Sequence, residues 1–155
     1  MFYKADYFVL EDTTLEDYYM EVEDGVIVGF SKNEPSDYEY LGEIVAPGLV
    51  DTHIHGYAGK DIMNAEEGAL DVISKGLLEC GVTSFLSTTL TDSKEKTDAA
   101  LKRVAAEYKD VKGAKVRGVF LEGPFFTEKY KGAQNPVHMS DPKIDYLKDW
   151  LDISD

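Results

Sequence analysis

The hydrophobic and polar positions follow two different patterns, one before and one after residue 45. Residues 1–45 alternate between apolar and polar side chains, which is typical of half-buried β-strands. The clearest alternation covers residues 19–30, where Asp24-Gly25 supplies the positive-φ positions of a tight hairpin turn. A β unit this small buries little core by itself, so we expect it to pack against something else.

From residue 43 onwards, short apolar runs alternate with segments of helical spacing. We expect strands over 44–51, 82–88 and 115–121, the first of them buried. We expect helices over 65–80, over 93–108 and from Asp141-Pro142 onwards. The apolar face of the first helix is expected to comprise Leu70, Ile73, Leu77 and Leu78. Ser93 is the expected N-cap of the second helix.

Strands that alternate with helices predict an α/β fold with parallel βαβ units and right-handed crossovers. Three strands are consistent with an open doubly wound sheet or with the beginning of a (β/α)8 barrel. A barrel typically takes about 250 residues, whereas this chain has 155. If the strands belong to a barrel, the barrel is incomplete in this chain.

Two of the three histidines stand two residues apart at the end of the first of these strands. Side chains alternate along a strand, so His53 and His55 share one face, with Cα atoms about 6.6 Å apart. Their ring nitrogens could therefore bind one ion at about 2.1 Å. Asp51 lies on the same face and could orient a ligand or the backbone. The alternative is a chance pair of histidines at a strand end.

Glu122 ends the third predicted strand and is delivered to the same rim of the sheet. A carboxylate can bind a cation or bridge two, although Glu122 is also one of 30 acids and could be an ordinary solvated residue. His138 is expected to be a surface histidine in a loop. Residues 56–61 lack the spacing of a phosphate-binding loop, so we expect a flexible strand-to-helix turn there.

Composition narrows the partners and the compartment. A formal net charge of −14 argues against nucleic acid or an anionic membrane surface as partner. The chain has no apolar run of the roughly 20 residues that span a bilayer, and its N-terminus lacks the pattern of a signal peptide. The single cysteine cannot form an intrachain disulfide, which is consistent with a cytoplasmic location.

Three stretches of the chain resemble the amidohydrolase superfamily, and within it the N-acetylglucosamine-6-phosphate deacetylases. They are Ala46–Gly56 with the His-x-His pair, Asp61–Ala65, and Leu121–Phe126 followed by Lys131–Pro136. The last is the most specific, because the His-x-His pair also occurs in dihydroorotases, ureases and adenine deaminases. The resemblance implies that residues 1–45 are part of a small β-sandwich-like unit. Residues 46–155 would then be the first βα units, about three strands, of a (β/α)8 metal-dependent hydrolase barrel that is incomplete in this chain.

The resemblance also implies an activity and a site. The reaction would convert N-acetylglucosamine 6-phosphate to glucosamine 6-phosphate and acetate, using water activated by a divalent metal, zinc or iron, as one or two ions. The positions that match metal ligands are His53, His55 and Glu122. Ala133 and Gln134 match a pair that contacts the amino-sugar phosphate substrate, although many relatives have histidine in place of Gln134.

The same resemblance places two further metal-binding histidines and the catalytic aspartate beyond Asp155. We therefore expect no catalytic residue in this chain and no activity of the chain alone. A homo-oligomer is implied, a dimer in the complete enzyme. Because three barrel strands leave an unpaired edge and an uncovered apolar face, we expect this chain to self-associate, to bind another chain, or to adopt an open three-layer arrangement.

Two other interpretations remain open at this point. The chain could be a catalytically dead remnant that packs, binds a sugar phosphate weakly or associates with a partner. It could also belong to another amidohydrolase, such as a cyclic-amide hydrolase. Glu122-Gly123-Pro124 together with Lys131-Gly132 argues against this last interpretation.

Overall fold

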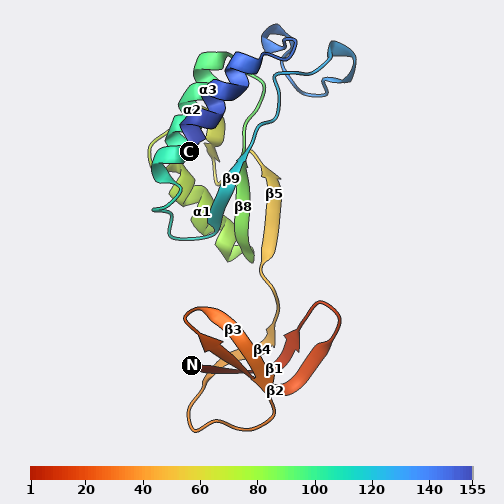
Figure 1. Ribbon diagram of the computed structural model, residues 1–155, viewed down its shortest axis with the longest axis vertical. Helices are drawn as coiled ribbons and strands as arrows, with labels where there is room; N and C mark the ends of the chain where they lie inside the picture. Colours follow the sequence, from red (N-terminus) through yellow and green to blue (C-terminus); the bar gives the residue numbers. More distant parts are fainter. Residues whose placement is uncertain (155) are drawn as a thin grey trace. The chain divides into compact units, whose positions relative to one another are not determined.

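A computed structural model describes residues 1–154, which form two compact units. The first unit is Met1–Pro47, and the second begins at Gly48. Each unit has its own sheet (Figure 1). Each also has its own buried core. No helix within residues 1–154 is both long and apolar enough to cross a membrane.

The first unit is a mixed four-stranded sheet in the order β3-β2-β1-β4. Its strands are β1 Phe2–Val9, β2 Thr14–Glu23, β3 Val26–Ser31 and β4 Glu39–Val45. The β1–β2 and β2–β3 pairs are antiparallel, whereas β4 runs parallel to β1. The predicted Asp24-Gly25 turn is confirmed, with φ angles of 47° and 77°. Ala5, Phe8 and Met20 form the buried core of this sheet.

The second unit is built on a parallel three-stranded sheet in the order β5-β8-β9. The strands are β5 Leu49–Ile54, β8 Val82–Thr88 and β9 Lys115–Phe120. The helices are α1 Ala69–Glu79, α2 Lys94–Glu107 and α3 Ile144–Ser154, which Figure 1 shows together on one side of the sheet. The predicted α/β alternation of parallel strands and helices is confirmed.

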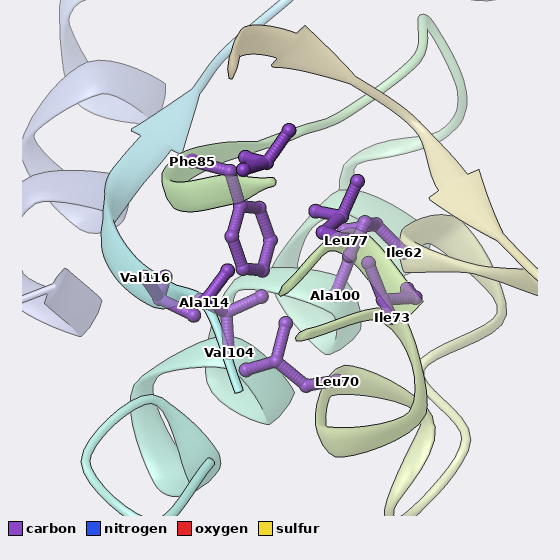
Figure 2. Packing of buried hydrophobic residues seen from close by; sticks show 10 residues of the cluster. Ile62, Leu70, Ile73, Leu77, Phe85, Ala100, Val104, Ala114 and Val116 are labelled. Atoms are coloured by element: carbon purple, nitrogen blue, oxygen red, sulfur yellow. The ribbon is translucent and has the colours of Figure 1, made fainter. Parts of the chain in front are cut away.

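The core of the second unit lies between the sheet and the helices α1 and α2. Figure 2 shows Phe85 extending from β8 into this cluster, where its side chain is fully buried. The buried members are Ile62, Leu70, Ile73, Leu77, Val82, Phe85, Ala100, Val104, Ala114 and Val116. Leu78 was expected in this core, but it is 45% exposed. It follows Leu77 by one residue, about 100° around the helix, and so points away from the apolar stripe.

The strand predicted over 44–51 is wrong in two respects. It is divided, because β4 ends at Val45 and β5 begins at Leu49. Pro47, which has no N–H for a sheet ladder, lies between them. The β5 segment is also not buried, since Leu49 and Val50 are 62% and 65% exposed. Leu49 and Val50 are consecutive, so their side chains point to opposite faces of this edge strand, and neither face is covered there.

Two predicted helix starts are also wrong. The helix α1 begins at Ala69 rather than at residue 65, because Ala65 and Gly68 have positive φ angles of 50° and 74°. These left-handed conformations cannot continue a right-handed helix. The helix α3 begins at Ile144, and the Leu147 N–H donates to the Lys143 carbonyl. The N-cap is therefore at Lys143, after Asp141-Pro142.

Residues 56–61 form an ordered ribbon rather than the flexible turn expected there. The ribbon pairs β6, Gly56–Tyr57, with β7, Lys60–Asp61, in antiparallel fashion. Its turn residues Ala58 and Gly59 have φ angles of 52° and 78°, as a tight hairpin requires. The Tyr57 ring packs against Gly76 of α1, where an added Cβ would collide with it. The ribbon leads into a 3-10 turn, η1, Ile62–Asn64.

Candidate metal centre

Three potential metal ligands from two strands converge at the carboxyl end of the parallel sheet. His53 and His55 come from the end of β5, and Glu122 lies two residues after β9. Glu122 Oε2 is 3.0 Å from the Nε2 atom of each histidine, and the two Nε2 atoms are 3.3 Å apart. Within residues 1–154, this is the one group of three such side chains close enough to bind an ion together.

The geometry of this group fits a divalent cation. Tetrahedral bonds of about 2.1 Å place neighbouring ligand atoms about 3.4 Å apart, close to the separations found here. His55 Nδ1 lies 3.2 Å from the Thr88 carbonyl oxygen. A carbonyl only accepts hydrogen bonds, so Nδ1 is the donor in this contact, and Nε2 is the ring atom that faces Glu122 and a cation.

The group is accessible from one side and supported on the other. The His53 and His55 side chains are 49% and 35% exposed, and Glu122 is 22% exposed. The His53 ring packs against Phe120, the last residue of β9, with centroids 5.0 Å apart. A small molecule could therefore reach the Nε2 atoms from solvent.

Asp51 supports the His53 backbone. Its Oδ1 accepts a hydrogen bond of 2.9 Å from the His53 N–H. This hydrogen bond lies where the pairing of β5 with β8 shifts register, between Asp51 and Ile54. Whether Asp51 affects metal binding stays a prediction.

No family model matches the chain. Among curated proteins, an N-acetylglucosamine-6-phosphate deacetylase from Vibrio furnissii is 43% identical over 117 residues, which are 74% of this chain and 29% of that protein. An N-acetylgalactosamine-6-phosphate deacetylase from Escherichia coli O157:H7 is 35% identical over 152 residues, covering 97% of this chain and 40% of that protein.

Solved structures agree with these relatives. N-acetyl-D-glucosamine-6-phosphate deacetylase from Mycobacterium smegmatis matches with a TM-score of 0.82 and 26% identity, over 99% of this chain and 44% of that one. A mutant of the same enzyme, in complex with N-acetyl-D-glucosamine-6-phosphate, matches with a TM-score of 0.79 and 25% identity, over 99% of this chain and 40% of that one.

The chain resembles the N-terminal portion of N-acetylglucosamine-6-phosphate deacetylases. The resemblance predicted from the sequence is thereby confirmed. The chain spans less than half the length of these deacetylases, with shares of 29%, 40% and 44%.

Ala133 and Gln134, which were expected to contact the substrate, lie in the loop after β9. This loop contains two 3-10 turns, η2 Glu128–Tyr130 and η3 Pro136–His138. Ala133 is exposed, whereas Gln134 is only 5% exposed and its Oε1 accepts a 2.8 Å hydrogen bond from the Thr91 N–H. Gln134 therefore anchors the loop, and its Nε2 is the group left to contact a ligand. Substrate contact by either residue stays a prediction.

The same loop contains His138, which was expected to be a surface histidine. It ends η3, its side chain is 31% exposed, and its Nε2 lies 3.4 Å from Asp92 Oδ1. It is not a member of the metal-binding group. The side-chain hydrogen bond from Lys96 is the main cause that holds the pKa of Asp92 below its usual range, with a smaller contribution from His138.

Sequence reasoning missed three buried threonines, one at the end of β8 and two in the segment that follows it. The Thr88 hydroxyl accepts from the Ile54 N–H at 3.0 Å, and the Thr89 hydroxyl accepts from the Glu122 N–H at 3.2 Å. Thr91 donates its N–H to the loop of Gln134, and its Oγ1 occupies the space that a Cβ on Gly123 would need. The only signal in the sequence was a set of hydroxyl side chains at a strand end.

Proposed function

We propose that the chain is part of a metal-dependent amidohydrolase that converts N-acetylglucosamine 6-phosphate to glucosamine 6-phosphate and acetate. The observation that carries this proposal is the convergence of His53, His55 and Glu122 at one sheet end, in a chain whose relatives are named for this deacetylation. A divalent cation bound there, zinc or iron and one or two ions, would polarise the acetamide carbonyl and make water a better nucleophile at neutral pH.

The residues of this chain have distinct parts in the proposal. The histidines offer Nε2 atoms as metal ligands, and Glu122 offers a carboxylate oxygen. This ligand set suits a borderline cation. Gln134 can donate from Nε2 to a substrate oxygen, with Ala133 beside it. The catalytic aspartate and the remaining ligands of the deacetylases are expected outside this chain, so we propose that the chain alone does not turn over substrate.

We propose that residues 1–45 belong to a small β-sandwich and that residues 46–155 are the first βα units of a (β/α)8 barrel. The complete enzyme would act in the cytoplasm as a homodimer, without a nucleic-acid or membrane partner. Support comes from the parallel β5-β8-β9 sheet and from the match to the M. smegmatis deacetylase over 99% of the chain.

A second candidate substrate is N-acetylgalactosamine 6-phosphate. The relative named for this substrate matches 97% of the chain, a larger share than the 74% matched by the V. furnissii relative. The two sugars differ only in the configuration at one ring carbon. Both substrates therefore belong in every assay.

The first experiment tests the metal site by titrating Zn2+ into the metal-free chain. We expect His55→Ala to weaken binding at least about tenfold, because it removes one of the ligands. His138→Ala is the matched control, since His138 is the third histidine and lies outside the group. Equal Zn2+ affinities of His55→Ala and His138→Ala would contradict the proposed site.

The second experiment tests the substrate by NMR and by acetate release. With Zn2+ present, either sugar phosphate should shift the Ala133 and Gln134 amide resonances, while N-acetylglucosamine without phosphate should bind more weakly. We expect no acetate release from the chain alone. Failure of both sugar phosphates to bind would contradict the proposed substrate class, and the sugar that binds more tightly identifies the preferred substrate.

A further inference from the structure

The strand β5 departs from regular pairing at the histidines. Its register with β8 shifts between Asp51 and Ile54. In a regular parallel ladder, each inward N–H finds a carbonyl on the neighbouring strand. Here the Ile54 N–H, which lies between the two histidines, donates instead to the Thr88 hydroxyl at 3.0 Å. The Thr88 side chain thus replaces a backbone carbonyl as the hydrogen-bond acceptor in the segment that contains His53 and His55.

Thr88 supports this segment with two different groups. Its hydroxyl lies 3.3 Å from the Leu86 carbonyl, to which it donates, so its lone pairs are free to accept from Ile54. Its own carbonyl accepts from His55 Nδ1 at 3.2 Å. The Thr88 side chain is fully buried, so these groups are shielded from competing water.

The next residue supports the ligand on the other neighbouring strand. The Thr89 hydroxyl accepts from the Glu122 N–H at 3.2 Å, and the Thr89 N–H donates to the Phe120 carbonyl at 3.0 Å. Because β8 is the central strand of the sheet, consecutive residues at its end contact the ligand-bearing segments on both sides.

We propose that Thr88 is a positioning residue of the metal site. Its hydroxyl fixes the backbone between His53 and His55, and its carbonyl keeps the His55 proton on Nδ1, so that Nε2 faces the ion. The proposal rests on the metal site proposed above and adds the residue that sets its geometry. Partners of this kind typically change metal affinity about 10- to 100-fold when they are removed.

The first test measures Co2+ binding to the full 155-residue chain by the visible absorption of the bound ion. Thr88→Val has nearly the same shape but no hydroxyl, and we expect its Co2+ affinity to fall about 10- to 100-fold. Thr88→Ser restores the hydroxyl and should bind within about threefold of the unmodified chain, which distinguishes positioning from packing.

Ser87→Ala provides the matched control. Ser87 precedes Thr88 on β8 and is fully buried, but its hydroxyl has no hydrogen-bond partner in the part of the chain that the structure describes. We expect this variant to bind Co2+ like the unmodified chain. Equal affinities for Thr88→Val and the unmodified chain would overturn the proposal.

The second test requires no metal. In the metal-free chain, nitrogen-15 NMR of the imidazoles should show the His55 proton on Nδ1, and amide exchange should show a protected Ile54 N–H. Thr88→Val keeps the carbonyl that contacts His55 Nδ1 but lacks the hydroxyl that accepts from Ile54, so its Ile54 amide should exchange rapidly. Unchanged Ile54 protection in that variant would overturn the proposal.

These readouts separate this proposal from the proposed function. If the unmodified chain binds no Co2+, the metal site itself fails, and the ring and amide signals alone decide whether Thr88 positions His55. If Thr88→Val does not fold, the unmodified chain and Thr88→Ser decide it. An unprotected Ile54 amide in the unmodified chain would then overturn the proposal.

Discussion

The two units of the chain differ in how they are built and in how they carry charge. The first unit has twelve acidic residues against two lysines, whereas the rest of the chain has eighteen acidic residues against fourteen basic ones. The first unit buries three apolar side chains in its core cluster and the second buries ten. The candidate metal ligands lie in the unit with the larger core, which agrees with the need of such ligands for rigid elements beneath them.

The difference in core size predicts where the largest stability effects will fall. Phe85 is fully buried among residues of the sheet and of helices α1 and α2. We expect Phe85→Ala to destabilise the second unit by about 3–5 kcal/mol, from lost apolar burial and a residual cavity. Urea unfolding followed by fluorescence measures this, because the single tryptophan, Trp150, belongs to the second unit.

The corresponding variant is Phe8→Ala, which removes the only aromatic side chain among the buried members of the first unit's core cluster. It should abolish the dispersed amide NMR signals of the first unit, because a core this small tolerates little loss. The Trp150 transition should not move. A shift of that transition as large as the one caused by Phe85→Ala would show that the units are not independent.

A smaller effect concerns the contact between α2 and α3 in the second unit. Asp98 accepts from Trp150 Nε1 at 2.7 Å and from Lys94 Nζ at 2.8 Å. Burial is the largest single influence and raises the pKa of Asp98, but these two hydrogen bonds and the charges of Lys94 and Lys102 together hold the pKa below its ordinary value of 3.8. We expect Asp98→Asn to cost about 1.5–3 kcal/mol, the usual value of hydrogen bonds to a charged group.

The pH dependence follows from this lowered pKa. The stabilisation is fully present above the unfolded value, near 3.8, and is lost as the pH falls through the lower folded value. Urea unfolding between about pH 5 and pH 2 should therefore be less pH-dependent in Asp98→Asn. Asp149→Asn is the control, because Asp149 also pairs with Lys94 but is 55% exposed. Equal slopes for Asp98→Asn and the unmodified chain would contradict the role of Asp98.

The smallest effect tests the difference in charge. Raising the salt concentration shortens the range of repulsion among the acids of the first unit, since the Debye length is about 10 Å at 0.1 M and about 3 Å at 1 M. We expect the first unit to gain on the order of 0.5 kcal/mol and the second unit less. Amide exchange, read separately for each unit at low and high NaCl, measures the gain. Equal gains in stability for the two units would show that their difference in net charge does not affect their stability.

The sequence predicted best those features that depend on neighbours along the chain. Val82–Thr88 is a strand with the predicted bounds, because a run of β-branched and apolar residues directly follows Gly81. Ser93 caps α2 as expected, since its hydroxyl accepts from the Lys96 N–H. The convergence of His53, His55 and Glu122 was predictable because parallel strands end at a common edge.

The features that were missed depend on residues far apart in the sequence or on unusual backbone angles. The positive φ of Ala65 delays the start of α1, although alanine favours helices. The hydrogen bond from Ile54 to Thr88 joins residues 34 positions apart and exists only because β5 shifts register. Gln134 was expected at the substrate, and its contact with Thr91 was not visible in any local pattern.

Gly76 has a consequence for attempts to make this protein more robust. Replacing a glycine within a helix by alanine is a standard route to thermostability, because it favours the helix by about 1 kcal/mol. At Gly76 the added methyl group would collide with the Tyr57 ring. Tyr57 is two residues from His55 and belongs to the ribbon that directly follows it. An engineer who improves α1 at this position would therefore disturb one of the histidines that make the site worth preserving.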